Sequence, residues 1–145
     1  MDSEQAVRDL MARSCDAVAR GDVDAWCACW RDDGVWEMPG LGPRRGIDAL
    51  RKEFAAARAK LELCIQEPLF GWVEVSDPAA TARWYVRETQ RAHTGYGEEL
   101  VGCYDDLVLR DEETWRFARR RFWVLYRGPR PVPGEVFRTP PPAAT

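Results

Sequence analysis

The first sixty residues carry the apolar period of amphipathic helices. Between residues 3 and 20, small and apolar side chains recur at helical spacing and form one stripe. The members of this stripe are Val7, Leu10, Met11, Ser14, Ala17 and Val18. Ser3 suits the N-cap of this helix and Gly21 suits its stop. A second helix is predicted to start at the capping residue Asp22, and a third to span about residues 47–60.

After residue 60 the apolar period changes to two, which is typical of strands. Four long strands are predicted, over residues 61–75, 81–92, 99–109 and 115–126, with a short strand at 35–38 before the third helix. Pro68 and Gly71 indicate a bulge or bend in the first long strand. The proline-rich residues 129–145 cannot continue a sheet, so they are predicted to form a tail after a single domain of residues 1–128.

This order of elements predicts an α+β fold. Four long strands in hairpin succession favour a curved, cone-shaped antiparallel sheet, with the three N-terminal helices packed on its concave face. Such a cone can enclose one deep pocket, which is where a small molecule would bind.

Composition narrows the functional classes. The chain has 145 residues, enough for one domain, and a net charge of −3, which disfavours nucleic acid and anionic membranes as partners. No apolar run is long enough to span a membrane, and the acidic first ten residues do not resemble a signal peptide, so a cytoplasmic protein is expected. The five cysteines and the single histidine lack the spacing of a zinc site, and no flavin or nicotinamide motif is present. Reduced thiols, no metal and no cofactor are therefore expected.

The turn "RDEET" sets the expected register of the last two strands. Centring the turn on residues 112–113 places Asp105 opposite Arg120 and Leu107 opposite Ala118, on the same face of adjacent strands. We expect this mostly apolar face to be the concave one.

The residues predicted to line the cavity alternate with outward-facing positions along the strands. Together with one residue of the first helix and one of a loop, they form the predicted substrate-binding set of Ser14, Trp36, Met38, Trp84, Val86, His93, Leu107, Ala118 and Phe122. Two members have a simpler interpretation. Ser14 suits a hydroxyl bonded to its own helix, and His93 suits a solvated loop.

Three charged residues stand among these positions and are the predicted catalytic residues: Glu88, Asp105 and Arg120. Asp105 is expected to pair with Arg120, and a purely structural ion pair is the alternative, because a buried charge needs a partner. One arginine neutralises one acid, so Glu88 is the better candidate for proton exchange. Asp32 and Asp33 suit turn and capping positions.

The chain resembles a SnoaL-like domain over roughly residues 4–128. The segments that carry the resemblance are "GDVDAW", "DDGVW", "YDD" and "WRFARR". The resemblance implies the cone fold but no single reaction, because the wider superfamily includes ketosteroid isomerase, scytalone dehydratase, limonene epoxide hydrolase, hexachlorocyclohexane dehydrochlorinase, polyketide cyclases and non-catalytic binding domains.

The chain departs from this family at its usual base. Ketosteroid isomerases carry a tyrosine where this chain has Ser14, and the proton-abstracting aspartate where it has Met38. The aspartate of the dehydrochlorinases falls at Ala19, and their histidine falls near residues 64–66, where the chain has none. The family's His–Asp base is therefore missing.

Three other positions match the family. Asp105 aligns with the second acid of the isomerases, a carboxyl that is kept protonated to stabilise an oxyanion. Trp36 and Arg120 align with cavity residues of the dehydrochlorinases.

The leading hypothesis is a cofactor-independent lyase or isomerase that acts by acid/base chemistry on a polyketide- or steroid-like substrate. Cyclisation, dehydration and isomerisation all fit this hypothesis. A non-catalytic small-molecule binding domain is the alternative, favoured by the missing His–Asp base. Epoxide hydrolysis, which needs two acids and an arginine about a water, is a further alternative.

Two surface features complete the sequence-based predictions. A homodimer through the convex face of the sheet is expected, because Tyr104, Phe117, Trp123 and Leu125 have no helix left to cover them. In the tail, the apolar residues at 136 and 137 (Val136 and Phe137) are expected to fold back over an apolar surface.

Overall fold

The structure, a computed structural model, describes residues 2–144 and contains three helices and six strands. In chain order these are α1 (Ser3–Arg20), α2 (Val23–Ala28), β1 (Trp30–Met38), β2 (Gly42–Arg45), α3 (Ile47–Ala59), β3 (Leu61–Ser76), β4 (Ala79–Ala92), β5 (Gly97–Asp111) and β6 (Thr114–Pro129). The predicted helices and long strands are all present. No helix among the described residues is long and apolar enough to cross a membrane.

The helix ends follow capping chemistry, with one shift. Asp2, rather than the predicted Ser3, caps α1 by accepting a hydrogen bond from the backbone N–H of Gln5 at 2.8 Å. Gly21 ends this helix with a φ of 65°, a left-handed conformation that glycine adopts without strain. Asp22 caps α2, as predicted, by accepting from the N–H of Ala25.

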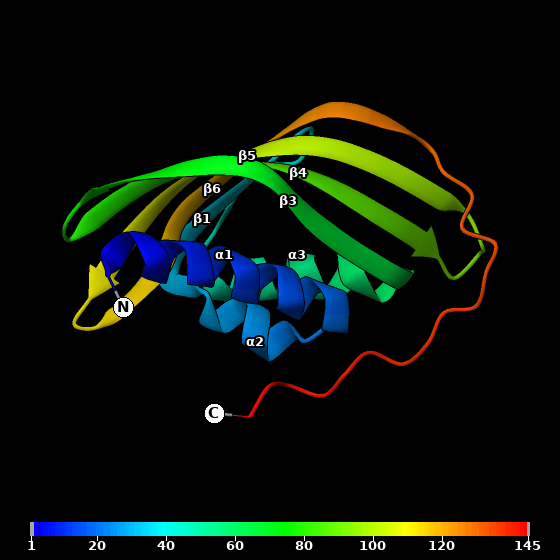
Figure 1. Ribbon diagram of the computed structural model, residues 1–145, viewed down its shortest axis with the longest axis horizontal. Helices are drawn as coiled ribbons and strands as arrows, with labels where there is room; N and C mark the ends of the chain where they lie inside the picture. The colour runs from blue at the N-terminus through cyan, green and yellow to red at the C-terminus, as the bar shows by residue number, and fades with distance from the viewer. Residues whose placement is uncertain (1, 145) are drawn as a thin grey trace.

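The six strands form one open, curved sheet in the order β2-β1-β6-β5-β4-β3. The four long strands make an antiparallel meander, which confirms the predicted hairpin succession. β1 lies parallel to β6, so the sheet is mixed rather than wholly antiparallel. Figure 1 shows the sheet arching over the three helices, which lie on its concave side. The predicted α+β cone is thus confirmed.

Two strands near the start of the sheet differ from the prediction. β1 begins at Trp30, and its pairing with β6 is interrupted between Trp30 and Val35, where the "RDDG" turn was expected. β2 was not predicted; it lies in the Pro- and Gly-rich segment between β1 and α3 and pairs antiparallel with β1. Whether a short edge segment such as β2 forms a strand depends more on the strand beside it than on its own sequence pattern.

The β5–β6 hairpin contains a one-residue bulge that the sequence did not reveal. Val108 pairs with Phe117, whereas the next pair joins Leu107 to Arg119. Ala118 is therefore the extra residue, and residues 119–124 of β6 move by one position relative to β5, before a second shift between Val101 and Gly102.

The predicted pairing of Asp105 with Arg120 is wrong for this reason. Arg120 pairs with Asp106 on the concave face, and Asp105 pairs with Arg121 on the outer face. The predicted pairing of Leu107 with Ala118 is wrong as well.

The predicted bend in β3 is present. The pairing of β3 with β4 shifts between Pro68 and Phe70. Gly71 follows directly, and an added Cβ there would lie 2.2 Å from the carbonyl oxygen of Arg83. Glycine is required at this close approach of two backbones.

The core lies between the helices and the concave face, and aromatic rings dominate one end of it. The ring of Trp26 stacks on Phe54 with centroids 4.3 Å apart and lies 5.1 Å from Trp36. Trp30 joins this cluster at 5.4 Å from Trp26. These rings fix α2 and α3 against β1, and three of them, Trp26, Trp36 and Phe54, line the cavity described below.

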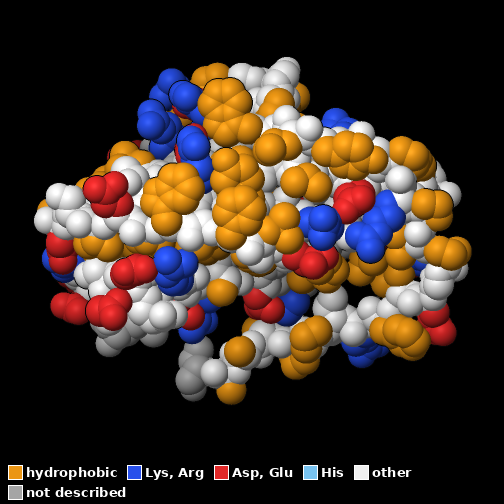
Figure 2. Space-filling view, turned by 45° about the horizontal axis from the view of Figure 1, so that its top comes forward, with side chains coloured by type: hydrophobic (Ala, Val, Ile, Leu, Met, Phe, Trp, Pro, Cys, Tyr) orange, Lys and Arg blue, Asp and Glu red, His pale blue; other side chains and the backbone are white. Residues whose placement is uncertain are grey.

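The outer face of the sheet carries exposed aromatic side chains between arginines, as Figure 2 shows. Phe70, Trp72 and Trp123 are all at least half exposed, at 61%, 51% and 50%. Of the residues predicted for this face, Trp123 and Leu125 are exposed, whereas Tyr104 and Phe117 are buried on the concave side.

The tail passes beneath the helices after β6 ends (Figure 1). Its polar anchor is Arg91, which donates hydrogen bonds to the carbonyl oxygens of Val132 and Gly134 at 2.7 and 2.6 Å. Phe137 is 74% exposed, so the prediction that it packs on an apolar surface is wrong, while Val136 is half-buried.

Candidate functional site

A mostly apolar cavity of about 580 Å³ includes several of the predicted site residues. It lies between the helices and the concave face of β3 to β6. Its apolar wall includes Trp26, Trp36, Phe54, Leu100 and Phe122. Gly102 leaves room for the Phe122 ring of this wall, because an added Cβ there would lie 2.1 Å from a ring carbon of Phe122. Flat rings on several sides suit a flat, mostly apolar ligand.

A line of polar groups crosses the opposite wall, and Glu88 lies at its centre. The amides of Gln66 and Gln90 donate to the Glu88 carboxylate at 3.3 and 2.9 Å, and the Cys64 thiol donates to it at 3.1 Å. All of these donors are neutral. No Lys or Arg of residues 2–144 forms a salt bridge with Glu88. Its charge is thus held by hydrogen bonds and not by a fixed counter-ion.

Strand pairing explains why these groups meet. Gln66 on β3 pairs directly with Glu88 on β4, and both face the cavity. Burial raises the pKa of the Cys64 thiol, and the adjacent Glu88 charge raises it further. Cys64 therefore acts as a neutral hydrogen-bond donor and not as a thiolate.

Tyr104 on β5 extends the polar line. Its hydroxyl oxygen accepts a hydrogen bond of 3.2 Å from the same Gln66 amide that contacts Glu88. Burial raises the pKa of the Tyr104 phenol, although the nearby positive charge of Arg120 opposes this shift. The phenol therefore keeps its proton at neutral pH.

Arg120 and Asp106 form a buried ion pair behind this wall. Arg120 donates to the two carboxylate oxygens of Asp106 at 2.7 and 3.1 Å, and the indole N–H of Trp84 donates to the same carboxylate at 3.1 Å. Burial raises the pKa of Asp106, with the charge of Arg120 and these hydrogen bonds acting against the shift. The pair does not line the cavity.

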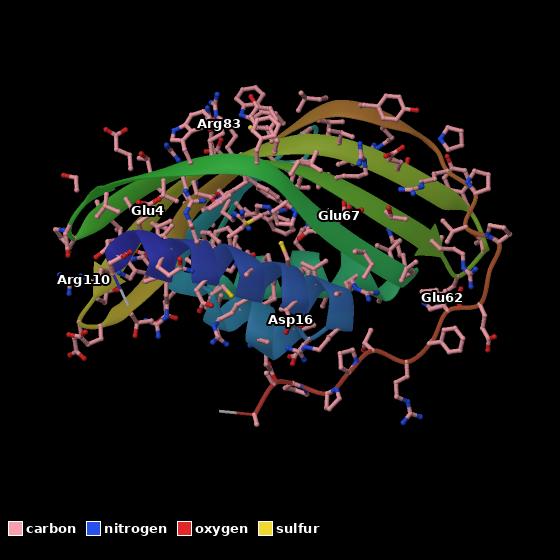
Figure 3. The ribbon with its side chains drawn as sticks, viewed as in Figure 1. Glu4, Asp16, Glu62, Glu67, Arg83 and Arg110 are labelled. Carbon is pink, nitrogen blue, oxygen red and sulfur yellow. The ribbon has the colours of Figure 1, made fainter. Side chains whose placement is uncertain are left out.

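Asp105 lies on the opposite side of the sheet. Its carboxylate accepts two hydrogen bonds from Arg83, at 2.6 and 2.8 Å, and one from the indole of Trp123 at 3.3 Å. Figure 3 shows Arg83 on the outer side of the sheet, away from the helices. Asp105 therefore cannot act in the cavity, and its predicted catalytic role is wrong.

The remaining predicted residues divide into three groups. Trp36, Met38 and Phe122 line the cavity, as predicted. Trp84 and Val86 share its face of the sheet but are buried in the core.

The third group lies away from the cavity. Leu107 faces outward and Ala118 is the bulged residue, because the β5–β6 pairing shifts between Val108 and Leu107. His93 is exposed in the β4–β5 loop. Ser14 is fully buried and donates to the carbonyl oxygen of Met11 at 2.7 Å, which supports its simpler interpretation.

Sequence reasoning missed the polar residues around Glu88 and behind it, namely Cys64, Gln66, Gln90, Tyr104 and Asp106. Tyr104 and Asp106 share the parity of Gly102 on β5, and that parity would have placed them in the cone once the bulge was known. Gln66 lies in the segment 64–66 near which the resemblance places the dehydrochlorinase histidine, and its side chain is a neutral amide. Among the described residues, no group of three His, Cys, Asp or Glu side chains is arranged to hold a metal ion.

Comparison with protein families gives a match to the SnoaL-like domain over residues 1–121. The chain belongs to the SnoaL-like family. No curated protein matches this SnoaL-like chain at a significant level. Many solved structures share its fold.

Three of these structures illustrate the range of the fold. A Novosphingobium aromaticivorans protein, provisionally described as an aromatic ring hydroxylase, is 24% identical, with a TM-score of 0.81 and coverage of 87% of this chain and 92% of that one. A second protein from that organism, provisionally described as a scytalone dehydratase, is 17% identical, with a TM-score of 0.81 and coverage of 91% and 94%. A type 2 hexachlorocyclohexane dehydrochlorinase, LinA, is 18% identical, with a TM-score of 0.78 and coverage of 97% and 94%. Similarity at this level establishes the fold.

Proposed function

We propose that this SnoaL-like protein is a cofactor-independent lyase or isomerase that moves a proton on a flat, apolar small molecule. Cyclisation, dehydration and isomerisation of a polyketide- or steroid-like substrate are the reactions that fit. The observation that carries the proposal is the Glu88 carboxylate, which lines an aromatic cavity and is held only by neutral donors. A carboxylate with no fixed counter-ion can take up and release a proton during a reaction.

The proposal explains how the chain could do without the family's histidine. Gln66 stands near the expected histidine position, and Glu88 lies directly across from it on β4. The base would thus be displaced by one strand while facing the same cavity. The fold neighbours named as dehydrochlorinase and dehydratase agree with this class of chemistry.

A non-catalytic binding domain is the second candidate, and the neutral Gln66 favours it. The positions of the charged residues do not support epoxide hydrolysis. Of the three residues it needed, Asp105 faces outward and Arg120 is buried against Asp106, so only Glu88 lines the cavity.

The test uses β-tetralone, a bicyclic ketone whose acidic α-protons exchange with solvent when a base removes them. Nuclear magnetic resonance in heavy water measures the exchange rate with and without protein. The wild-type protein should accelerate the exchange, and Glu88→Gln should reduce the acceleration by about 10²–10⁴-fold, the usual contribution of a general base. Glu67→Gln is the matched control, because Glu67 is exposed on the same strand as Gln66.

Two results would reject the proposal in different ways. Unchanged exchange in folded Glu88→Gln would remove Glu88 as the base. Binding of β-tetralone without any acceleration by the wild-type protein would favour the binding-domain candidate.

A further inference from the structure

Tyr104 lines the cavity with a phenol whose ring is packed against the Arg120 guanidinium. Its hydroxyl lies beside Glu88, although the strand pattern predicted Tyr104 on the convex face. We propose that the Tyr104 hydroxyl donates a hydrogen bond to the substrate oxygen on which negative charge develops, and that Arg120 positions its ring. This inference rests on the proposed function, because it assigns the partner of the Glu88 base.

The direction of the hydrogen bonds leaves the Tyr104 proton available. The Gln66 amide nitrogen lies 3.3 Å from the Glu88 carboxylate, and an ionised carboxylate only accepts hydrogen bonds. This nitrogen must therefore be the donor toward Glu88, and it is also the donor toward the Tyr104 oxygen. The Tyr104 hydroxyl accepts a hydrogen bond from Gln66. Within residues 2–144, the hydroxyl donates its proton to no protein acceptor.

The placement of Tyr104 suits a donor that works together with Glu88. Both oxygens contact one amide nitrogen, so both lie on the same wall and a short distance apart. When a base removes a proton next to a carbonyl, negative charge moves to the carbonyl oxygen. A carboxylate and a phenol on one wall can divide these tasks: the carboxylate removes the proton, and the phenol donates a hydrogen bond to the carbonyl oxygen. The catalytic donor is thus assigned to β5, where the family resemblance placed an acid at Asp105.

Arg120 holds the Tyr104 ring from behind. Its guanidinium carbon lies 3.9 Å from the centroid of Tyr104 and 4.0 Å from that of Phe117, so the cation is held between two rings. Asp106 fixes the guanidinium through two hydrogen bonds. A cation against the ring also favours the charged form of the phenol, which strengthens the hydroxyl as a donor. Arg120 is therefore a positioning residue, since it does not line the cavity.

The test measures a hydrogen bond directly and does not depend on turnover. The infrared carbonyl stretch of β-tetralone bound to the wild-type protein should move to lower frequency than in an apolar solvent. Tyr104→Phe should remove this shift and weaken β-tetralone binding by roughly two- to tenfold, the net value of one hydrogen bond. Binding of tetralin, which has the same rings without the oxygen, should stay unchanged.

Tyr85→Phe is the matched control. Tyr85 lies on the neighbouring strand but faces outward, with its ring stacked on Phe70 at 4.5 Å. Its substitution should leave both ligands unaffected. Arg120→Lys keeps a charge for Asp106 but loses the flat contact with Tyr104, so it should reduce the carbonyl shift. An unchanged shift in folded Arg120→Lys would overturn the positioning role.

The wild-type measurement keeps the proposal open to refutation even if Tyr104→Phe fails to fold. A ketone that does not bind, or that binds with an unshifted carbonyl stretch, overturns it. Equal loss of β-tetralone and tetralin binding in Tyr104→Phe also overturns it, because that result indicates a purely structural role. A shifted stretch without α-proton exchange would instead leave Tyr104 as the donor and reject Glu88 as the base, so the two proposals fail separately.

Discussion

The Asp106 carboxylate accepts two hydrogen bonds from Arg120 on the adjacent strand, and both residues are almost fully buried, at 5% and 4% exposure. Its sequence neighbour Asp105 points to the other face of the sheet and binds Arg83 instead. Two successive acids therefore have separate environments, which gives each a separate and measurable effect on stability.

Asp106→Asn should destabilise the fold strongly. The change leaves the Arg120 guanidinium buried without its charge partner, which costs about 3–5 kcal/mol in the free energy of unfolding. Urea unfolding followed by circular dichroism measures this loss. Asp105→Asn is the matched control and should cost much less, because that carboxylate is partly exposed. Equal losses in both variants would contradict the register described above.

Asp105 should make stability fall in acid. The hydrogen bonds from Arg83 lower the pKa of Asp105, with burial opposing and the Trp123 indole assisting. Because the folded-state pKa is below the unfolded value of about 3.9, the stabilisation is present above that pH and is lost as the pH falls through the folded pKa. Unfolding free energies measured in urea at several acidic pH values should therefore decline less steeply in Asp105→Asn than in the wild type. Parallel curves would show that this ion pair contributes nothing to acid sensitivity.

The fold was predictable because its determinants are local and repeated. The apolar stripe of α1, the caps at Asp22 and Gly21 and the period-two pattern of β3 to β6 each point to one structure. The parallel contact of β1 with β6 was not predictable in the same way, because residues far apart in sequence make it and no local pattern encodes it.

The site was less predictable because it depends on register. A single extra residue, Ala118, exchanged the faces assigned to Asp105 and Asp106. Glu88 was placed correctly, because the alternation of β4 is uninterrupted from Ala79 to Arg91 in its pairing with β5. Nothing in the sequence of β6 marks the bulge, since neither a glycine nor a proline stands there.

A homodimer through the outer face of the sheet is expected, since Phe70 and Trp72 on β3 and Trp123 on β6 are exposed there. Light scattering at micromolar concentration should give about twice the chain mass of 16.6 kDa. Trp123→Asp should shift the mass toward one chain, because a charge in an apolar interface loses its hydration. Phe137→Asp in the exposed tail should leave the mass unchanged. A monomeric wild-type protein would rule out the dimer.

Deletion of residues 131–145 should lower the melting temperature. The deletion removes both carbonyl oxygens to which Arg91 donates, and hydrogen bonds to a charged donor are stabilising. We expect a decrease of about 2–8 °C in differential scanning calorimetry. Phe137→Ala should have no effect, because this side chain is exposed. If deletion changes neither the melting temperature nor β-tetralone binding, the tail is a passive extension.

Gln66→His tests whether the β3 and β4 positions serve the same reacting atoms. Gln66 lies across from Glu88 and lines the cavity, so an imidazole at this position would reach the same region from the neighbouring strand. In a Glu88→Gln background, Gln66→His should recover at least about tenfold of the lost β-tetralone exchange, because a neutral imidazole is an effective general base. The recovered rate should rise with pH through the histidine range near about 6.5, since only the unprotonated ring accepts a proton. Ile65→His is the control, because residue 65 is partly exposed and alternates to the outer face. Recovery by Ile65→His, or none by a folded Gln66→His variant that still binds β-tetralone, would show that the reacting atoms do not lie at this wall.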